Sequence, residues 1–372
     1  MTKYENGNVN NPLKGRKTFK AGISIIFRNY GNCPECGKQT FKVVCPSCHN
    51  ILPPSTINGT NMIISIVGSR DTGKSHFVGV IIKELRERVL RFNGGAMYPE
   101  EDTEERYEAA FGRNLYTDFQ RLEKTMSSLE NRNNGAYRPL IYRYDVPHKK
   151  LALDIQHRNL IQENDTFTFV FFDTAGEDLD DEDMMSTVNK YICKSSGIIF
   201  LLDPMQIPEV RNKLDAKTIA RATSATSLPK RADDIMARVS RLIRNDKNLP
   251  DGKKIDIPVA AVFSKFDAIY SIIPEGCTVL ETSPHYTKKS FYLPDWHNVN
   301  SEVKGLLEEW NAGSFTSQLE ANYTDYSYFA VSALGLGNSP REDGGIEKPR
   351  PHRIEDSFLW LLMKNGVIKS SQ

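Results

Sequence analysis

Short apolar runs alternate with longer segments of helical periodicity along most of the chain. Residues 62–67 form an apolar, β-rich run that ends at a glycine, and apolar residues then recur at helical spacing over 75–92. Strand-like patterns return at 137–146, 166–173, 197–203, 257–264 and 328–332. Several of these runs are apolar throughout, which is typical of parallel strands buried on both faces. The pattern predicts an α/β fold with a mostly parallel sheet flanked by helices.

The segments between these runs predict the helices and insertions of the fold. Helical patterns cover 102–130, 231–247, 299–311 and 354–364. The stretches 204–230 and 271–297 indicate irregular insertions, and 338–352 is a loop rich in Pro, Gly and charged residues. We therefore expect one large domain over 60–368, with a helical insertion at about 94–135 and loop insertions at about 204–230 and 271–297.

Composition and charge narrow the class of protein. With 372 residues, 39% of them hydrophobic and 26% charged, the chain has enough apolar material for a sizeable core. Length alone would allow two or three domains, but the motifs below occur in the order of one α/β unit. The net charge is +1, from 48 basic and 47 acidic residues. No global field therefore favours nucleic acid or an acidic membrane as the default partner.

The amino-terminal end and the length of the apolar runs bear on location. Residues 1–14 are polar and Asn-rich and lack the apolar stretch of a secretory signal peptide, and we expect 1–29 to be a flexible segment. The longest apolar runs, 167–172 and 197–202, are far shorter than the roughly 20 residues that span a bilayer. The sequence predicts a cytoplasmic protein without a transmembrane segment.

A phosphate-binding loop follows the first apolar run. The segment that matches G-x-x-x-x-G-K-[ST], together with the next residue, consists of Gly68, Ser69, Arg70, Asp71, Thr72, Gly73, Lys74, Ser75 and His76. The glycines let backbone N–H groups wrap a β-phosphate at distances that a Cβ would prevent. Lys74 supplies positive charge at the β- and γ-phosphates, and Ser75 offers its hydroxyl to Mg²⁺ at a helix N-terminus that favours anions. A chance match is the alternative, but the strand before and the helix after supply the context that the motif requires.

A second motif follows the apolar run that ends at residue 172. Asp173 stands at the end of that run, in the sequence D-T-A-G-E, and can hold Mg²⁺ through water. The N–H of Gly176 can bind the γ-phosphate only while that phosphate is present. The motif resembles the D-x-x-G switch of Ras-like and translation-factor-related GTPases. An aspartate in a turn after a strand is the plainer alternative.

The residues that would act on the attacking water depart from the Ras-like pattern. Many small GTPases carry a water-orienting Gln after that glycine, where this chain has Glu177. Glu177 could accept a hydrogen bond from the water, but its charge would repel the γ-phosphate unless it is neutralised. We therefore expect slow turnover or a catalytic group supplied by a partner. Arg70 stands where small GTPases usually have Gly, so it either acts on the γ-phosphate in cis or is a solvated side chain.

The first switch of such a GTPase needs a threonine that covers Mg²⁺ and the γ-phosphate. Thr125 is the expected residue, because it follows the charged helical segment and precedes the strand at 137–146. Thr103 and Thr117 are alternatives, and a threonine on a helix surface is the plainer interpretation of all three.

A base-reading motif follows the run at 257–264. Residues 263–267, F-S-K-F-D, resemble the N-K-x-D motif of GTPases, in which the aspartate accepts hydrogen bonds from guanine N1–H and the exocyclic amine. The resemblance assigns that role to Asp267 and packs the stem of Lys265 along the base. Ser264 stands where the family has Asn, which weakens the expectation of guanine specificity.

A second base-reading element follows the last strand-like run. It matches the S-A-K/L motif of GTPases, whose backbone amide meets guanine O6, and consists of Ser332, Ala333 and Leu334. Alone this match would mean little. Four elements in the order of the family, each at the end of a predicted strand, favour a GTPase more strongly than any one of them.

Four of the six cysteines form two C-P-x-C pairs, which consist of Cys33, Cys36, Cys45 and Cys48. Each pair turns tightly enough to bring two thiolates to one tetrahedral ion, so two pairs complete a closed site. In a reducing compartment this spacing indicates structural Zn²⁺ rather than disulfides. The sequence C-x-x-C-H at 45–49 also matches a haem attachment signature, but haem attachment needs export and would leave the first pair unused. We expect a small zinc ribbon over 30–52 that serves as a docking or stabilising module.

Over roughly residues 30–365 the chain resembles bacterial TRAFAC-clade GTPases of the double-GTPase type, which are often encoded with multi-component defence systems. The shared features are the cysteine pairs, the phosphate loop, D-T-A-G-E, the long region before the second strand and the segment 351–362. The resemblance implies a regulatory GTPase that uses GTP, GDP and Mg²⁺ and acts on a protein effector or neighbouring subunits. The alternatives are a non-cycling scaffold with bound nucleotide and a related P-loop ATPase, which Lys265 and Asp267 disfavour.

Overall fold

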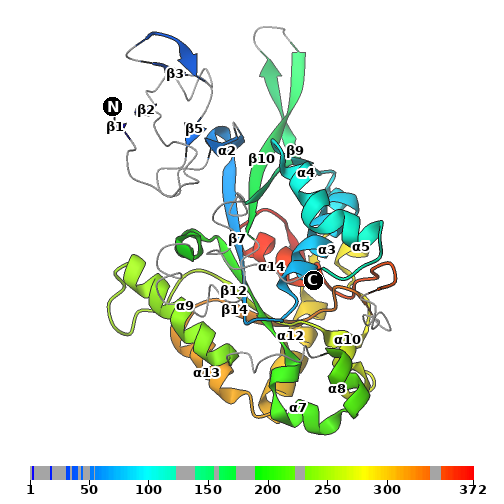
Figure 1. Ribbon diagram of the computed structural model, residues 1–372. Helices are drawn as coiled ribbons and strands as arrows, with labels where there is room; N and C mark the ends of the chain where they lie inside the picture. Colours follow the sequence, from blue (N-terminus) through cyan, green and yellow to red (C-terminus); the bar gives the residue numbers. More distant parts are fainter. Residues whose placement is uncertain are drawn as a thin grey trace.

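A seven-stranded sheet forms the centre of the protein (Figure 1). The computed structural model describes residues 2–3, 17–18, 31–33, 36–40, 43–44, 51–53, 55–122, 139–154, 159–172, 189–222, 231–335 and 345–372. The strands of the sheet are β7 (Thr60–Gly68), β8 (Ala96–Pro99), β9 (Leu140–Asp154), β10 (Asn159–Phe172), β11 (Gly197–Leu202), β12 (Val259–Phe263) and β14 (Tyr326–Ala330). All six strand-like runs of the sequence are strands of this sheet, so the expected α/β class is confirmed.

The order of the strands is β14-β12-β11-β7-β10-β9-β8. The five strands from β14 to β10 pair in parallel, whereas β9 is antiparallel to both β10 and β8. Strands β9 and β10 continue together as a long hairpin beyond the rest of the sheet (Figure 1). β8 was not expected, because it lies within the region 94–135 that the sequence predicts to be helical.

Two hydrophobic cores lie on the two faces of the sheet. In β11, Ile199 and Leu201 pack into one core and Phe200 packs into the other, because successive side chains of a strand point to opposite faces. Helices α3 (Lys74–Glu87) and α14 (Asp356–Lys364) cover the first face. Helices α9 (Ala232–Asp246), α12 (Leu293–Glu309) and α13 (Gly313–Asn322) bury apolar residues in the second core. The result is a sheet with helices on both sides.

The insertion at 204–230 corrects the expectation of an irregular loop. It contains α7 (Pro208–Lys213) and α8 (Ala216–Ala222). Pro208 stands at the first helical position of α7, where its fixed φ and missing N–H are tolerated. Asp215 caps α8 by accepting the Thr218 N–H at 2.9 Å. Both helices are short, which is why no clear apolar period marks them.

Other boundaries also differ from the expectation. The helix expected over 75–92 ends at Glu87 and continues as a 3₁₀ turn (Val89–Asn93), and the helix expected over 299–311 begins at Leu293. In α12 a proline stands in the first turn, where a helix accepts it, which extends the helix into the expected loop. Ser55–Asn58 forms the short helix α2 before β7. At the carboxyl end β15 (Ser370–Ser371) pairs with β13 (Phe291–Tyr292), so the domain extends beyond residue 368.

The helical insertion packs closely against α3. It contains α4 (Thr103–Tyr107), a π-helical turn (Glu108–Gly112) and α5 (Arg113–Tyr116). Gly79 of α3 makes this contact possible, because a Cβ there would lie 2.9 Å from the Phe111 Cβ. The Tyr107 hydroxyl donates a 2.8 Å hydrogen bond to the Gly79 carbonyl. The described part of the insertion is therefore fixed to the helix that follows the phosphate loop.

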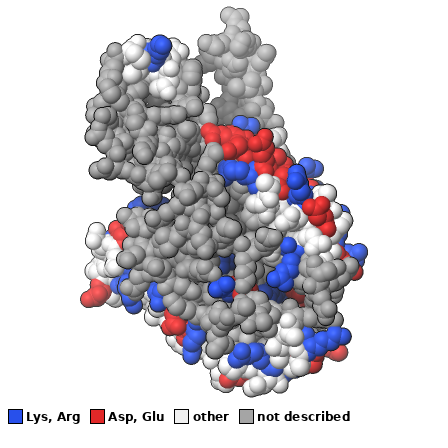
Figure 2. All heavy atoms as spheres, in the orientation of Figure 1, with Lys and Arg blue, Asp and Glu red and all other residues white. Residues whose placement is uncertain are grey.

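Acidic and basic side chains are mixed over most of the described surface in Figure 2, in line with the net charge. Acidic side chains gather over and beside α4, where Glu100, Glu101, Asp102, Glu104, Glu105 and Glu108 follow one another closely. Arginines pair with several of them, as Arg86 does with Glu104 at 2.9 Å. Among the described residues, no helix combines the length and apolar character that crossing a membrane requires.

Candidate functional site

The carboxyl ends of four parallel strands meet at one edge of the sheet. Leu201 lies beside Gly68, Leu202 beside Phe263, and Phe263 beside Ala330. The residues that follow these strands therefore leave the sheet next to one another. The chain continues from β7 to strands on one side of it and later, from β11, to strands on the other side. In open parallel sheets, such a reversal of strand order marks the crevice where ligands bind.

The phosphate-loop segment connects β7 to α3 through a backbone that requires glycine at two positions. Gly73 has φ 82°, a left-handed conformation that glycine adopts without cost. A Cβ on Gly68 would lie 2.9 Å from the Leu201 carbonyl oxygen and 2.8 Å from Thr72 Oγ1. Asp71 is also left-handed, with φ 62°. The conformation therefore explains both glycines of the motif.

Lys74 folds back across this loop. Its Nζ donates hydrogen bonds to the carbonyls of Gly68 at 2.9 Å and Ser69 at 2.8 Å, and the side chain is buried. Thr72 is also buried and donates to the Ser69 carbonyl at 2.9 Å. The loop thus holds an ammonium group at the amino end of a 14-residue helix, where the helix dipole also favours an anion.

Asp203 and the turn after β11 join this loop to the base-reading motif. The Lys265 Nζ donates to Asp203 Oδ2 at 2.7 Å and to the Ala222 carbonyl at 3.0 Å. Asp203 Oδ1 accepts the Met205 N–H at 2.9 Å and so caps the 3₁₀ turn Pro204–Gln206. Gln206 Nε2 in turn donates to Ser69 Oγ at 2.5 Å. A continuous set of polar contacts therefore runs from Lys265 to the phosphate loop.

Asp267 and Ser332, which the sequence assigns to two separate base-reading motifs, are in direct contact. Ser332 Oγ donates a 2.5 Å hydrogen bond to Asp267 Oδ1 and accepts the Gly335 N–H at 2.9 Å. Burial raises the pKa of Asp267, and the bond from Ser332 and the charge of Lys265 oppose this. Leu334 follows in the same loop, and its carbonyl accepts the Arg350 N–H at 2.9 Å. The contact leaves Asp267 Oδ2 as the oxygen that does not receive the Ser332 bond.

His76, directly after the phosphate loop, contacts the helical insertion. Its Nε2 accepts the Leu122 N–H at 3.2 Å. This hydrogen bond joins the described part of the helical insertion to the first turn of α3. The pKa of His76 falls to about 4, because burial and the positive charges of Arg121 and Lys265 disfavour the imidazolium. The charge of Lys265 therefore acts on the residue directly after the phosphate loop. The ring is neutral at pH 7, with its proton on Nδ1.

The expected magnesium and water residues Asp173, Gly176, Glu177 and Thr125 lie outside the described residues. Strand β10 nevertheless ends toward the same edge of the sheet as the phosphate loop. Its last residue, Phe172, lies beside Ser65 of β7, three residues before Gly68. The alternative Thr103 is unsuited to a magnesium site, because it is buried and its Oγ1 accepts the Ile141 N–H at 3.2 Å. Thr117 is exposed after α5.

The first cysteine pair lies in a tight turn. Strands β3 (Gly31–Asn32) and β4 (Gln39–Thr40) flank it, and the Gly37 N–H donates to the Cys33 carbonyl at 2.8 Å. Gly37 has φ 70°, which explains a glycine directly after Cys36. Cys45 and Cys48 lie outside the described residues, but β5 (Val43–Val44) and β6 (Ile51–Leu52) pair on either side of them. Short antiparallel strands therefore flank each cysteine pair in the sequence.

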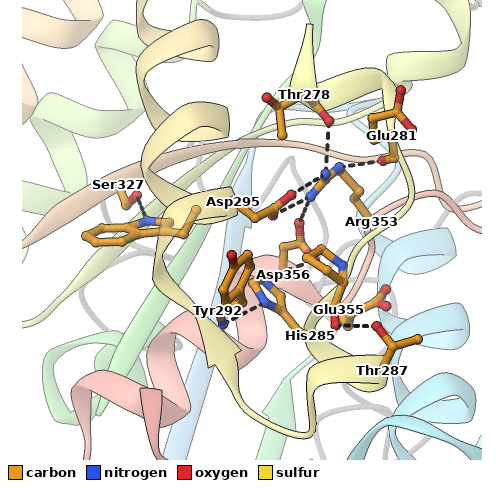
Figure 3. Close-up of polar contacts among 12 residues, drawn as sticks. Thr278, Glu281, His285, Thr287, Tyr292, Asp295, Ser327, Arg353, Glu355 and Asp356 are labelled. Carbon is orange, nitrogen blue, oxygen red and sulfur yellow. Dashed lines mark hydrogen bonds and ion pairs between the residues drawn. The ribbon is translucent and has the colours of Figure 1, made fainter. Parts of the chain in front are cut away.

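Among the described residues, a second cluster brings together three side chains of metal-ligating types, one histidine and two aspartates. Atoms of His285, Asp295 and Asp356 lie within 4.8 Å of one another, all buried (Figure 3). His285 Nδ1 accepts the Tyr292 N–H at 3.0 Å, so the proton of the neutral ring is on Nε2, the nitrogen that faces Asp356 at 3.8 Å. Burial lowers the pKa of His285 and keeps it neutral.

This donor set does not fit a metal ion. A protonated Nε2 has no lone pair for a cation, and Arg353 already occupies both oxygens of Asp295 and one oxygen of Asp356. The cluster is an ionic network centred on arginine. No motif indicates this network in advance, because its members are contributed by separate segments.

Two polar residues of the site were missed by reasoning from the sequence. Asp203 carries a usable signal, because it directly follows a fully apolar strand, as Ser264 does. Gln206 carries no such signal. It reaches Ser69, 137 residues away in the sequence, only because the 3₁₀ turn directs it there.

Comparison with known proteins gives one distant relative. No protein-family model matches the chain. The chain is 23% identical over 343 residues to a protein of Mycolicibacterium smegmatis described as "Putative ESX-1 scaffolding and assembly protein SaeC". The similar region covers 87% of this chain and 80% of that protein, so the similarity extends over most of both.

Proposed function

We propose that this protein binds GTP and hydrolyses it as a regulatory switch within a cytoplasmic multi-protein assembly. The contact that carries the proposal is the 2.5 Å hydrogen bond between Ser332 and Asp267, at the same sheet edge as the phosphate-loop segment. Two motifs that occur 65 residues apart meet there as a polar pair suited to the edge of guanine. Lys265 and the Asp203 turn connect that pair to the phosphate loop.

The residues present fit a nucleoside triphosphate. The left-handed Gly73 and the close approach at Gly68 shape a loop whose backbone N–H groups can face phosphate oxygens. Lys74 adds its charge to the β- and γ-phosphates. Asp267 accepts hydrogen bonds from guanine N1–H and the 2-amino group, which adenine does not offer in that arrangement.

Magnesium would be held by the hydroxyl of Ser75 and, through water, by Asp173. When bound, it neutralises charge on the β- and γ-phosphates. Turnover is expected to be slow, because Glu177 is a carboxylate where many small GTPases carry the amide of a glutamine. Arg70 or a group from a partner would then stabilise the charge that develops on the γ-phosphate.

The arrangement of strands is compatible with the Ras-like G domain that the sequence suggests. The phosphate-loop segment follows a central strand, and the switch segment begins after its parallel neighbour β10. The turn at Cys33 to Gly37 supports a zinc ribbon as a docking module at the amino-terminal end.

Nucleotide binding and hydrolysis test the proposal directly. Wild type is expected to bind GDP and GTP with magnesium, to bind ADP much more weakly, and to release phosphate from GTP. Lys74→Ala removes the charge at the β- and γ-phosphates and should abolish binding and turnover. Lys83→Ala is the matched control, because Lys83 lies on the same helix, where it pairs with Glu87 and lies over the Tyr116 ring. A wild type that takes up no guanine nucleotide would refute the proposal.

Asp267→Asn gives a sharper test of base recognition. Asparagine offers one acceptor and one donor, which match N1–H and the 2-carbonyl of xanthine. The variant should lose GDP and gain xanthosine diphosphate. A loss of all nucleotides together would instead indicate that Asp267 is structural.

The second candidate is a non-cycling scaffold, which the scaffolding and assembly role named for SaeC favours. In that case nucleotide binds without turnover and stabilises the fold. Single-turnover assays with GTP distinguish the two candidates, since the switch releases phosphate and the scaffold retains intact GTP. Purification of the tagged protein with its partners, for wild type and Lys74→Ala, then shows whether assembly depends on the nucleotide.

A further inference from the structure

The segment before α14 contacts the residues that carry and flank the Asp267–Ser332 pair. His352 and Ser332 form an isolated two-residue bridge, in which Ser332 N donates to His352 O at 3.0 Å and His352 N donates to Ser332 O at 2.9 Å. The His352 ring stacks on Phe266, which precedes Asp267, with centroids 5.7 Å apart and planes 11° from parallel. Its Nε2 lies 2.8 Å from the Val279 carbonyl oxygen. His352 thus contacts the backbone of Ser332 and the side chain next to Asp267.

Arg353 anchors this segment in the interior. A guanidinium carries five N–H donors. Nε donates to the Glu281 carbonyl at 2.8 Å, and Nη2 to the Thr278 carbonyl at 2.9 Å and Asp295 Oδ1 at 2.8 Å. Nη1 donates to Asp295 Oδ2 at 2.9 Å and Asp356 Oδ2 at 2.8 Å. Every donor therefore has an acceptor, as Figure 3 shows.

The ionic network holds Arg353 in a backbone conformation that it would otherwise avoid. Arg353 has φ 48°, in the left-handed region that costs a non-glycine residue on the order of 1 kcal/mol. Burial alone would lower the pKa of Arg353, but Asp295 and Asp356 raise it, so the guanidinium stays charged. The side chain of Arg353 is fully buried. His352 is thereby held in place by its fixed neighbour.

We propose that Arg353 is a positioning residue for base recognition, which holds His352 against Ser332 and Phe266 and thereby sets the place of the Asp267 carboxylate. This inference rests on the proposed guanine site. Arg353 does not act on the nucleotide itself. A lysine has three donors and no planar fork, so Arg353→Lys would leave two of the five acceptors unpaired. The His352 backbone would then lose its fixed orientation toward Ser332.

The experiment compares binding of GDP and inosine diphosphate, which lacks the 2-amino group. The ratio of their dissociation constants reports the bond between Asp267 and that amine, and we expect it to be on the order of tenfold or more in wild type. Arg353→Lys should reduce the ratio to a few-fold. A residue needed only for folding would lower the fraction of active protein and leave the ratio unchanged.

Two further variants make the test decisive. His352→Ala removes the stack on Phe266 and the Val279 contact but keeps the backbone bridge, and it should also lower the ratio. Trp296→Phe is the control. Trp296 follows Asp295 in the sequence, and the substitution removes the 2.7 Å hydrogen bond from Trp296 to Ser327 without changing Arg353. It should destabilise the fold and keep the wild-type ratio.

The outcomes separate this inference from the proposed function. An unchanged ratio in folded Arg353→Lys, or in His352→Ala if Arg353→Lys does not fold, overturns the inference. Absence of GDP binding in wild type overturns the guanine site itself.

Discussion

Lys265 and Asp203 form a 2.7 Å ion pair between the loops that follow two adjacent strands, β12 and β11. The Asp203 side chain is 6% exposed and also caps the turn that carries Gln206. The pair therefore fixes the stem of Lys265, which would flank the base, and the turn that contacts the phosphate loop. It is one link in the set of polar contacts between the base-reading motif and the phosphate loop.

Replacing this aspartate should weaken nucleotide binding as well as stability. Asp203→Asn removes the charge that Lys265 meets and weakens the cap, at an expected cost of about 1 to 3 kcal/mol in unfolding free energy. GDP affinity should fall severalfold. Urea unfolding and GDP titration measure the two effects. Asp246→Asn breaks the exposed Lys194 pair and should cost less than about 1 kcal/mol with no change in binding. Equal effects of the two variants would contradict the assigned role.

Substitution of glycine by alanine should have opposite effects at Gly68 and at Gly305. A Cβ at Gly68 would press against Leu201 and Thr72, so Gly68→Ala should displace the loop and abolish GDP binding. Gly305 lies exposed in α12 with nothing within 4 Å of a new Cβ. Gly305→Ala should therefore stabilise the protein by roughly 0.5 to 1 kcal/mol and leave binding unchanged. Thermal unfolding and GDP titration check both. Full GDP binding by Gly68→Ala would show that the loop does not need this glycine.

The strands were predictable because a strand buried on both faces has an apolar residue at nearly every position. Phe200 and its neighbours must all be apolar, and the strand must then end at a residue that can leave the sheet, as Gly68 and Asp203 do. The phosphate-loop segment was also predictable, because the backbone geometry requires both of its glycines and the motif lies within eight consecutive residues.

Contacts between residues that are far apart in the sequence produce no such local pattern. Arg353 meets Asp295, 58 positions away, through the fold alone, and Gln206 meets Ser69 through a turn that is too short to show a period. The short helices α7 and α8 were missed for the same reason. Their proline and aspartate caps are local signals, but they lie in a segment without an apolar stripe.

Recognition of guanine through Asp267 should depend on pH. The carboxylate must be ionised to accept two hydrogen bonds, and burial raises its pKa in the nucleotide-free protein. Binding favours the ionised form, so GDP affinity should fall as the pH drops through this raised pKa, and binding should release protons there. Calorimetry in buffers of different ionisation enthalpy measures the released protons. The residual GDP binding of Asp267→Ala should lack this dependence, and an identical dependence would exclude Asp267 as its source.

The cysteine pairs predict bound zinc. We expect about one zinc ion per chain of purified protein, and Cys33→Ser should lower that content, because a closed site needs all four thiolates. Elemental analysis measures the metal. Cys277→Ser is the matched control, since Cys277 is a partly buried cysteine outside the two pairs. Equal zinc content in the two variants would exclude the ribbon site.

Glu355 should make stability depend on pH. Burial, together with repulsion by Asp356, raises the pKa of Glu355 from its ordinary value near 4.5 to about 7, against the attraction of Arg88 at 3.5 Å. The folded state therefore keeps a proton that the unfolded chain releases above pH ~4.5. The stabilising effect of that proton is complete below this pH and is lost as the pH rises to about 7, at no more than about 1.4 kcal/mol per pH unit.

Glu355→Gln isolates this effect, because glutamine matches the protonated side chain and cannot ionise. Urea unfolding of wild type and variant between pH 5 and 8 should give curves that diverge with rising pH, with the variant the more stable at pH 8. Glu308→Gln, at an exposed position on α12, should give a constant offset from wild type over the same range. Parallel curves for Glu355→Gln and wild type would mean that the carboxyl group ionises at its ordinary pKa, and that Arg88 compensates fully for its burial.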